Sequence, residues 1–533
     1  MPNPPEHARR SSAEARRRAQ RPNGARASSP NSLPQSAGAT QLEARRRDRP
    51  VFRPVGAPIR APKGRAGRVN AAPGAAEVDR GARRPFQRLA QTTFINRDFA
   101  LVWWGQAISS IGDYAWDTAL VLWIATVLAR NQSWAPLAIS GVILAAALPQ
   151  ITVGPIAGVF VDRWDKRRTI VIATALQAIF AILLIPPVAS LPLPLVGNAR
   201  LPTFWALGVI YADVAILTIC AQFALPAQIA LITDLVPDAK EDQAQEMTQA
   251  IQGLAVVIGP PVAAALVFGA SVRWALLLNA LSFVVACAAV IAIHAPRSTV
   301  SVLPGETGHF MREFLDGVGY VLGHTILRTI LIAEALSWLG FGALQTLGFF
   351  FITENLHASP DLYGYFGADF GVGAIAGGLL VTVVGQRVGL ERILWIALIS
   401  SGIFVIVLSH LTSFPLALVA AFFFGVTATA ILVAAGTLSI DATERQFIGR
   451  VTTVLGPVGR LAAFISVVLS GSLVSTVLAD FRVSFLGIHF GPVNTIFTGT
   501  GLLAVAGGVY ARHTLGGAST QKPKSRGMNV PSR

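Results

Sequence analysis

The chain has 533 residues, of which 53% are hydrophobic and only 13% are charged. Because soluble domains usually carry about a quarter of charged residues, this composition excludes an ordinary soluble protein and predicts many membrane-spanning helices. The net charge of +15 is uneven, since residues 1–95 hold 20 Lys and Arg against 6 Asp and Glu, and the rest of the chain is nearly balanced. The two cysteines, Cys220 and Cys287, stand in apolar segments and form neither a metal-binding nor a disulfide pattern.

Residues 1–94 are rich in Arg, Ala, Pro, Ser and Gly and poor in aromatic residues. Such a segment buries too little apolar surface to offset its ordering entropy, so we expect a disordered basic tail. It has no apolar core region of a secretory signal, and an organellar transit peptide is the minor alternative. Its arginines suit anionic lipid headgroups, and we expect no nucleic-acid binding because no structured module accompanies them.

Twelve apolar segments follow, each long enough to cross about 30 Å of hydrocarbon as a helix. The predicted spans are 99–128, 135–159, 169–191, 203–224, 246–269, 273–294, 325–353, 363–385, 392–411, 413–439, 448–477 and 491–511. A polar stretch divides them into six and six, a plan that many transporters share, with the substrate site between the halves near the midplane. We therefore expect an all-α integral membrane protein that consists of the tail (1–94), a six-helix half (95–294), a central cytoplasmic loop (295–324), a second six-helix half (325–511) and a C-terminal tail (512–533).

The basic residues of the short loops predict the orientation. If the N-terminus is cytoplasmic, the inner loops hold eleven of them and the outer loops hold four. The inner set is Arg163, Lys166, Arg167, Arg168, Lys240, Arg297, Arg312, Arg387, Arg392, Arg445 and Arg450, and the outer set is Arg130, Arg200, Arg273 and Arg482. We expect both termini to be cytoplasmic and the protein to lie in the cell (plasma or inner) membrane, as a monomer.

The loop between the second and third spans reads GVFVDRWDKRR, from Gly158 to Arg168. It resembles the signature G-x-x-x-D-R-x-G-R-R of the major facilitator superfamily, with Gly158, Asp162 and Arg163 in place and Lys166 and Arg167 at the basic positions. Asp165 replaces the Gly of the general pattern, which resembles the exporter branch of macrolide-efflux and enterobactin-export proteins. The resemblance covers residues 95–511 and implies the twelve-helix major facilitator fold.

The resemblance also implies a role for this loop. Asp162 would act as a latch against the start of the eleventh span, near Gly449 and Arg450, where a carboxylate meets free backbone N–H groups and the helix dipole. Gly158 would allow close helix approach, and Arg163, Lys166 and Arg167 would complete the charge network. The alternative, that the basic residues only determine topology, does not account for Asp162.

The fifth span contains GLAVVIGPPVAA, in which Gly253, Gly259 and Pro260 resemble the antiporter motif of the same superfamily. Proline removes a helical hydrogen bond, so Gly259-Pro260 can bend the helix. Ala263 and Ala264 stand where the motif has Gly-Gly, and an ordinary proline kink is the alternative reading.

Ionisable residues inside spans are costly and therefore point to function. Asp113 and Asp117 are four residues apart on one face of the first span, Asp213 is in the fourth and Glu334 in the seventh. These spans line the central cavity in the superfamily, so we expect some of the four acids to carry a coupling proton or to hold a cationic group of the substrate. A structural carboxylate satisfied by neighbours such as Ser109, Ser110 or Tyr114 is the alternative, about equally weighted for Asp113.

These observations predict a secondary transporter that exports an amphipathic small molecule, such as a drug, macrolide or siderophore, by proton antiport and alternating access. No Walker A loop, cofactor motif or metal motif is visible, so we expect no enzyme activity and the proton gradient as the driving force. The alternatives are an importer or facilitator of a metabolite on the same fold and a membrane scaffold or sensor that works through its basic tail.

Overall fold

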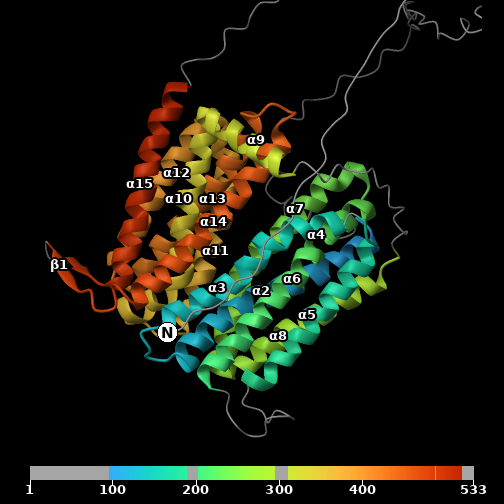
Figure 1. Cartoon of the computed structure of the whole chain (residues 1–533), viewed down its shortest axis with the longest axis horizontal. Helices are drawn as coiled ribbons and strands as arrows, with labels where there is room; N and C mark the ends of the chain where they lie inside the picture. Colours follow the sequence, from blue (N-terminus) through green and yellow to red (C-terminus); the bar gives the residue numbers. More distant parts are fainter. Residues whose placement is uncertain (1–94, 162, 189–201, 295–309, 486–487, 519–533) are drawn as a thin grey trace, which may run out of the picture. The chain divides into compact units, whose positions relative to one another are not determined.

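The computed structural model describes residues 95–518 apart from 162, 189–201, 295–309 and 486–487 (Figure 1). The first half consists of α2 (Arg97–Trp123), the π-helical turn η2 (Ile124–Leu128), α3 (Ala135–Thr152), α4 (Gly154–Val161), α5 (Lys166–Val188), α6 (Thr203–Leu235), the 3-10 turn η3 (Asp238–Lys240), α7 (Glu241–Gly269) and α8 (Val272–Ala292). The second part consists of α9 (Phe310–Gly323), α10 (Thr325–Phe350), the π-helical turn η4 (Phe351–Asn355), α11 (Leu362–Val388), α12 (Leu390–His410), α13 (Phe414–Asp441), α14 (Ile448–Ser475), β1 (Val483–Phe485), β2 (Ile488–Phe490) and α15 (Pro492–Ala518).

Within the described residues, twelve helices are long and apolar enough to cross a membrane. The expected all-α fold with twelve spans is therefore confirmed, and the chain is a multi-pass membrane protein. The spans alternate in direction, so the loops fall on two sides. We call the side of the membrane on which α2 begins the proximal side. The opposite side, where η2 ends the same span, is the distal side.

Local chemistry explains where several helices begin and end. Asn96 caps α2, because its side-chain oxygen accepts a hydrogen bond from the N–H of Phe99 at 2.7 Å. The first turn of α7 carries Glu241 and Asp242, which favour the positive end of the helix dipole. The fourth span continues to Leu235, eleven residues beyond the predicted end at 224, because Pro226 is accommodated inside α6.

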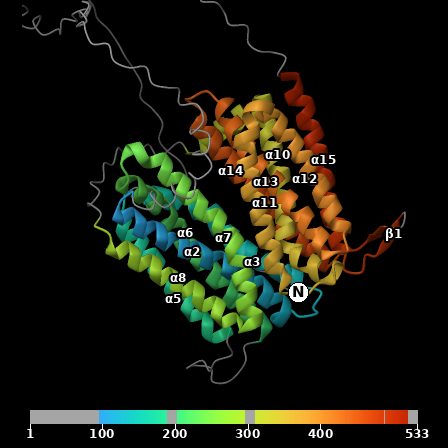
Figure 2. The ribbon, with the colours of Figure 1, turned by 180° about the vertical axis from the view of Figure 1, so that it is seen from behind.

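The helices of each half pack mainly on one another. In the first half α2 lies against α7 and α8, and α5 lies against α6 and α8; in the second half α12 packs on α13 and α15, and α10 on α14 (Figure 2). Two pairs make the most extensive contacts between the halves, α7 with α11 and α3 with α14, and α3 also contacts α10.

The hydrophobic core is distributed unevenly between the two sides of the membrane. The largest buried cluster draws residues from both halves, and its members lie in the distal parts of their helices, from Ala115 and Ile139 to Leu347 and Phe497. On the proximal side, one cluster belongs to the second half and three smaller clusters belong to the first. The halves therefore share a continuous core only on the distal side.

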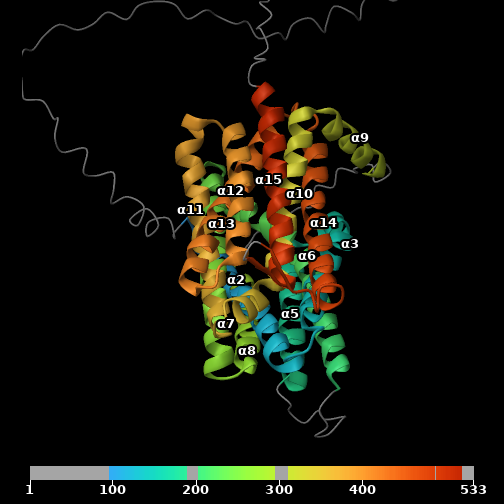
Figure 3. The same cartoon turned by 90° about the vertical axis from the view of Figure 1, so that its left-hand side faces the viewer.

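One helix and one β-hairpin were not predicted. The helix α9 forms within the segment expected to be a central loop, and Figure 3 shows it beside α10 at one end of the second bundle. It forms because apolar residues recur on one face: Val321 is fully buried, and the Tyr320 ring stacks on Phe447 at 4.5 Å. The strands β1 and β2 pair as a short antiparallel hairpin between α14 and α15.

Candidate functional site

The loop between α4 and α5 is tied to its own half by its charges. Lys166 forms an ion pair with Asp234 of α6, with the nitrogen 2.7 Å from the carboxylate oxygen. The Arg167 guanidinium donates to the carbonyl oxygens of Val290 and Ile291 at the end of α8. Asp165 caps α5 by accepting from the N–H of Arg168 at 2.7 Å. The residue that departs from the general signature thus has a local structural role.

The other members of the expected latch are Gly158, Asp162, Arg163 and the start of α14. Asp162 lies outside the described residues. Among those described, no atom beyond the neighbouring residues and the backbone of the same helix lies within 4 Å of where a Cβ would stand on Gly158 or on Gly449. No hydrogen bond or ion pair among the described residues involves the Arg163 side chain. The start of α14 is instead covered by α9, where a Cβ on Gly317 would stand 2.9 Å from the Arg450 carbonyl oxygen. The close approach expected at Gly158 is not made in this structure.

The glycine–proline motif of α7 lies where three helices meet. A Cβ on Gly259 would stand 2.5 Å from the Cβ of Tyr114 in α2, so the two helices touch closely there. On the adjoining side, a Cβ on Gly364 of α11 would stand 2.5 Å from the Pro260 carbonyl oxygen. Gly253 extends the same seam, with its Cβ position 3.3 Å from Ile375. The motif therefore forms a contact between the halves.

The second contact between the halves joins α3 to α14. The Ser140 hydroxyl donates to the Val467 carbonyl oxygen at 2.9 Å. A Cβ on Gly471 would collide with the Ser140 hydroxyl, so the two helices are as close as glycine permits. Both inter-half contacts include residues in the distal parts of their helices, in agreement with the shared distal core.

A polar stripe runs along α2. Gln106, Ser110, Asp113 and Asp117 follow one another at steps of four, three and four, which places them on one helical face. The side-chain nitrogens of Gln106 and of Gln252 in α7 each donate to the Ser110 hydroxyl at 3.2 Å. The predicted acids Asp113 and Asp117 therefore belong to a longer polar face that reaches α7.

Asp117 is exposed, although it lies inside a span between the buried residues Trp116 and Thr118. An exposed carboxylate at this depth is accessible, as a group that meets a substrate or a proton must be.

The other two predicted acids stand apart from this stripe. Asp213 in α6 is 6% exposed, and its Oδ2 has no hydrogen-bond partner among the described residues. Glu334 is half-buried in α10 of the other half. A buried carboxylate without a partner is costly in a protein interior, so Asp213 stays a functional candidate.

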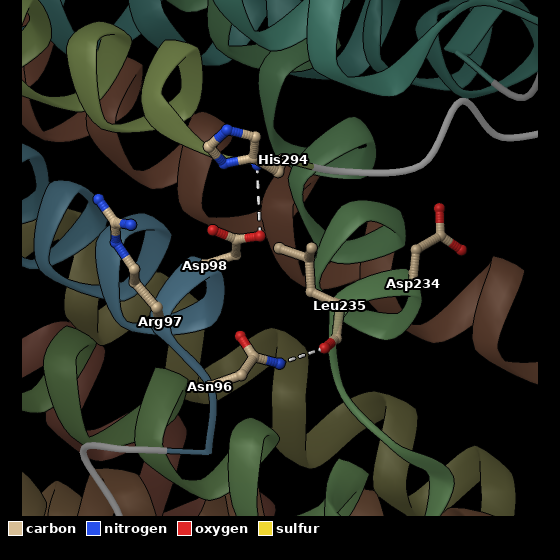
Figure 4. Close-up of a pocket in the computed structure, with 6 residues that line it drawn as sticks. All are labelled: Asn96, Arg97, Asp98, Asp234, Leu235 and His294. Atoms are coloured by element: carbon tan, nitrogen blue, oxygen red, sulfur yellow. Dashed lines mark hydrogen bonds between the residues drawn. The ribbon is translucent and has the colours of Figure 1, made fainter.

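A hollow of about 450 Å³ opens at the proximal end of the first half (Figure 4). Two hydrogen bonds connect its walls. The Asn96 side-chain amide donates to the Leu235 carbonyl oxygen, and the Asp98 carboxylate accepts from the backbone N–H of His294. Acidic and basic side chains mix on its wall, including Arg97 and Asp234. The lining residues come from the ends of α2, α6 and α8. Their mixed charges do not favour one class of ligand.

Comparison with known proteins identifies the family. The sequence matches the model of the family described as transmembrane secretion effector over residues 89–448, well over half of the chain. The chain belongs to this family. Macrolide efflux protein A of Streptococcus pyogenes is 24% identical over 380 residues, which cover 70% of this chain and 88% of the relative. A multidrug efflux pump of Mycolicibacterium fortuitum is 23% identical over 364 residues, or 65% and 82% of the two chains.

Solved structures support the fold. A D-xylose-proton symporter matches with a TM-score of 0.60 at 15% identity, covering 77% of this chain and 96% of its own. A bacterial homologue of the iron transporter ferroportin, in an inward-facing state, matches with a TM-score of 0.58 at 14% identity, covering 80% and 99%. The expected major facilitator fold and the resemblance to macrolide-efflux proteins are confirmed.

Several residues of the candidate site were not predicted from the sequence. Gly364, Gly367 and Gly371 form the face of α11 that packs on Pro260 and Val256, and their spacing of three and four residues was the available signal. Asp234, which pairs with Lys166, and Gln252, which bonds Ser110, carry no signal in the sequence because their partners are distant along the chain.

Breaking the Lys166–Asp234 pair is expected to cost about 0.2–1 kcal/mol of unfolding free energy, because exposed ion pairs are screened by solvent. The two side chains are 23% and 35% exposed. A double-mutant cycle of Lys166→Met, Asp234→Asn and both, followed by thermal unfolding in detergent, measures the coupling. Arg168→Met is the matched control for loss of one loop charge. A coupling free energy of several kcal/mol would contradict this expectation and show that solvent does not screen the pair.

Proposed function

We propose that this protein is a secondary active transporter that exports amphipathic small molecules across the cell membrane by proton antiport. The macrolide efflux protein and the multidrug efflux pump to which the chain is similar support export of drug-like substrates. The basic residues of the short loops support an orientation with both termini in the cytoplasm, so that the proximal side faces the cytoplasm.

The uneven core is the observation that carries this proposal. The halves share buried residues distally, whereas proximal clusters belong to single halves. Protein interfaces are bistable rather than continuously deformable, so two halves that pack on one side alone can exchange this packing for its counterpart on the other. The structure then corresponds to the state closed toward the outside, in which substrate enters from the cytoplasm.

The acids supply the exchange. In the state closed toward the outside, Asp117 is accessible, and its carboxylate would release a proton and receive the substrate. After the halves rock, a proton from outside would return to the carboxylate and displace the substrate. Because the same carboxylates bind either the proton or the substrate, protons that move inward down their gradient drive the substrate outward. Asp113, Asp213 and Glu334 are the further candidates for the proton.

Asp162 would complete the cycle on the cytoplasmic side. When that side closes, its carboxylate would engage the start of α14 near Gly449 and Arg450, with Arg163, Lys166 and Arg167 around it. The open space beside Gly158 and Gly449 agrees with a latch that is disengaged in the present state.

Accumulation of a macrolide and of an amphipathic dye in an efflux-deficient bacterial host tests the proposal. Cells that express the full chain are expected to accumulate less of a substrate than cells with an empty vector, and an uncoupler is expected to remove the difference. Higher accumulation would identify an importer or facilitator.

The scaffold or sensor alternative is separated by two variants in the same assay. Deletion of residues 1–90 is expected to leave export intact, whereas Asp162→Ala is expected to abolish it. The reverse pattern would place the function in the basic tail.

A further inference from the structure

The first span of each half ends in a π-helical turn. In η2 the Ala129 N–H donates to the Ile124 carbonyl oxygen at 2.7 Å, and in η4 the Leu356 N–H donates to the Phe351 carbonyl oxygen at 3.0 Å. These bonds span five residues instead of the four of an α-helix, an arrangement that is rare and is often found at functional sites. Because α2 and α10 hold the same place in their halves, the same uncommon feature occurs twice.

The two turns are also built alike. The third residue of each is a threonine whose hydroxyl donates one turn back, from Thr126 to the Leu122 carbonyl oxygen at 2.6 Å and from Thr353 to the Phe349 carbonyl oxygen at 3.0 Å. The first residue of each, Ile124 or Phe351, is fully buried. The duplication therefore extends to the side chains that hold the turns in place.

A residue in the left-handed region follows each turn. Asn131 has a φ of 58° and His357 a φ of 50°, and they are the two non-glycine residues with positive φ in the described part of the chain. This conformation is unfavourable for most side chains and persists where the surroundings hold it. The chain is thus redirected shortly after each turn, seven residues after Ile124 in one half and six residues after Phe351 in the other.

Each turn lies next to an element that joins the halves. The turn η2 packs on α3, whose Ser140 bonds α14. The Phe351 ring of η4 lies 6.4 Å from the Phe366 ring of α11, whose Gly364 packs on Pro260. Each π-helical turn is therefore one packed element away from a contact between the halves.

We propose that η2 and η4 are paired hinges at which the first and seventh spans bend when the distal contacts part. The extra residue of a π turn passes along a helix as bonds change one at a time from five-residue to four-residue spacing. The distal end then shifts by about 1.5 Å and about 100° per residue. Backbone hydrogen bonds are retained throughout, which membrane-buried helices require. This motion depends on neither the substrate nor the coupling ion of the proposed function.

A wedge between the halves tests the hinges without any ligand. Gly471→Leu places a side chain against Ser140 and is expected to part α3 from α14. Spin labels on Leu137→Cys and Val477→Cys, both exposed positions near the distal side, report the separation in nanodiscs. Cys220→Ser and Cys287→Ser remove the native thiols. We expect Gly471→Leu to add a longer distance to the single short distance of the parent chain.

Deletion of one exposed residue from each turn, Val127 and Glu354, is expected to convert the turns to α-helix. In the chain that carries both deletions, Gly471→Leu is expected to produce little of the longer-distance population that it produces in the parent chain. Deletion of the exposed Thr412, between α12 and α13, is the control for shortening a distal segment, and Glu354→Gln is the control for loss of its charge. Both controls are expected to keep the longer distance.

Equal longer-distance populations with and without the two deletions would overturn the proposal. If the double deletion does not fold, Thr126→Val with Thr353→Val keeps the residue count and removes the hydroxyl bonds. Loosened turns are then expected to raise the longer-distance population by about twofold or more, since each bond contributes a modest net stability. An unchanged population in that variant would also overturn the proposal.

Discussion

Replacing Gly364 by leucine is expected to abolish export while leaving the protein folded. A Cβ there would stand 2.5 Å from the Pro260 carbonyl oxygen and 2.7 Å from the Ala264 Cβ, so α11 can no longer pack on α7. Overpacking of this kind costs about 1–3 kcal/mol. If the cost falls on the distally closed state alone, the balance between states shifts roughly 5–150-fold. Initial export rates in the efflux-deficient host measure the loss.

Gly436→Leu is the matched control for this prediction. Gly436 lies in α13 and is exposed, and among the described residues no heavy atom lies within 4 Å of where its Cβ would stand, so the same substitution meets open space. We expect it to transport normally. Export by Gly364→Leu at the rate of the control would mean that the α7–α11 contact is not required for the transport cycle.

Replacing Asp117 by asparagine is expected to remove the dependence of transport on the pH gradient. The amide keeps the size of the side chain at this exposed position but neither binds nor releases a proton at neutral pH. Gradient-driven transport in proteoliposomes is expected to fall at least about tenfold, which corresponds to about 1.4 kcal/mol. Exchange of substrate at equal pH is expected to continue, because that reaction needs no net proton movement.

Glu334→Gln and Asp213→Asn show how the work is divided among the acids. Glu334 is in the other half, and Asp213 is buried without a partner at Oδ2 among the described residues, so a coupling role for either would give the same loss as at Asp117. Unchanged gradient dependence in both Asp117→Asn and Glu334→Gln would contradict coupling through these carboxylates.

The spans were predictable because the membrane imposes a length and an apolar composition on every crossing helix. The predicted span 325–353 is observed as α10 and η4, from Thr325 to Asn355, and 448–477 as Ile448–Ser475. Errors arose where a helix leaves the hydrocarbon, since hydropathy then stops reporting secondary structure. The fourth span continues to Leu235, and α9 forms inside a polar segment, because tertiary packing decides both.

The candidate site was predictable only as a set of residue types. The acids Asp113 and Asp117 stood out because charge is rare inside spans, but Gln252, which bonds Ser110 on the same polar face, comes from another helix and carries no such signal. The roles of Asp165, Lys166 and Arg167 depend on α5, α6 and α8 meeting at one end. The close helix packing expected at Gly158 can be seen only in a conformational state in which the helices meet there, and the present structure is not that state.

Purified full-length protein in proteoliposomes tests the central claim most directly, by recording proton movement and substrate movement together. With a macrolide or amphipathic dye on the side that corresponds to the cytoplasm, an imposed pH gradient is expected to drive substrate and protons in opposite directions. An uncoupler should abolish both movements. Substrate movement in the same direction as the protons, or movement that ignores the gradient, would contradict a proton-coupled exporter.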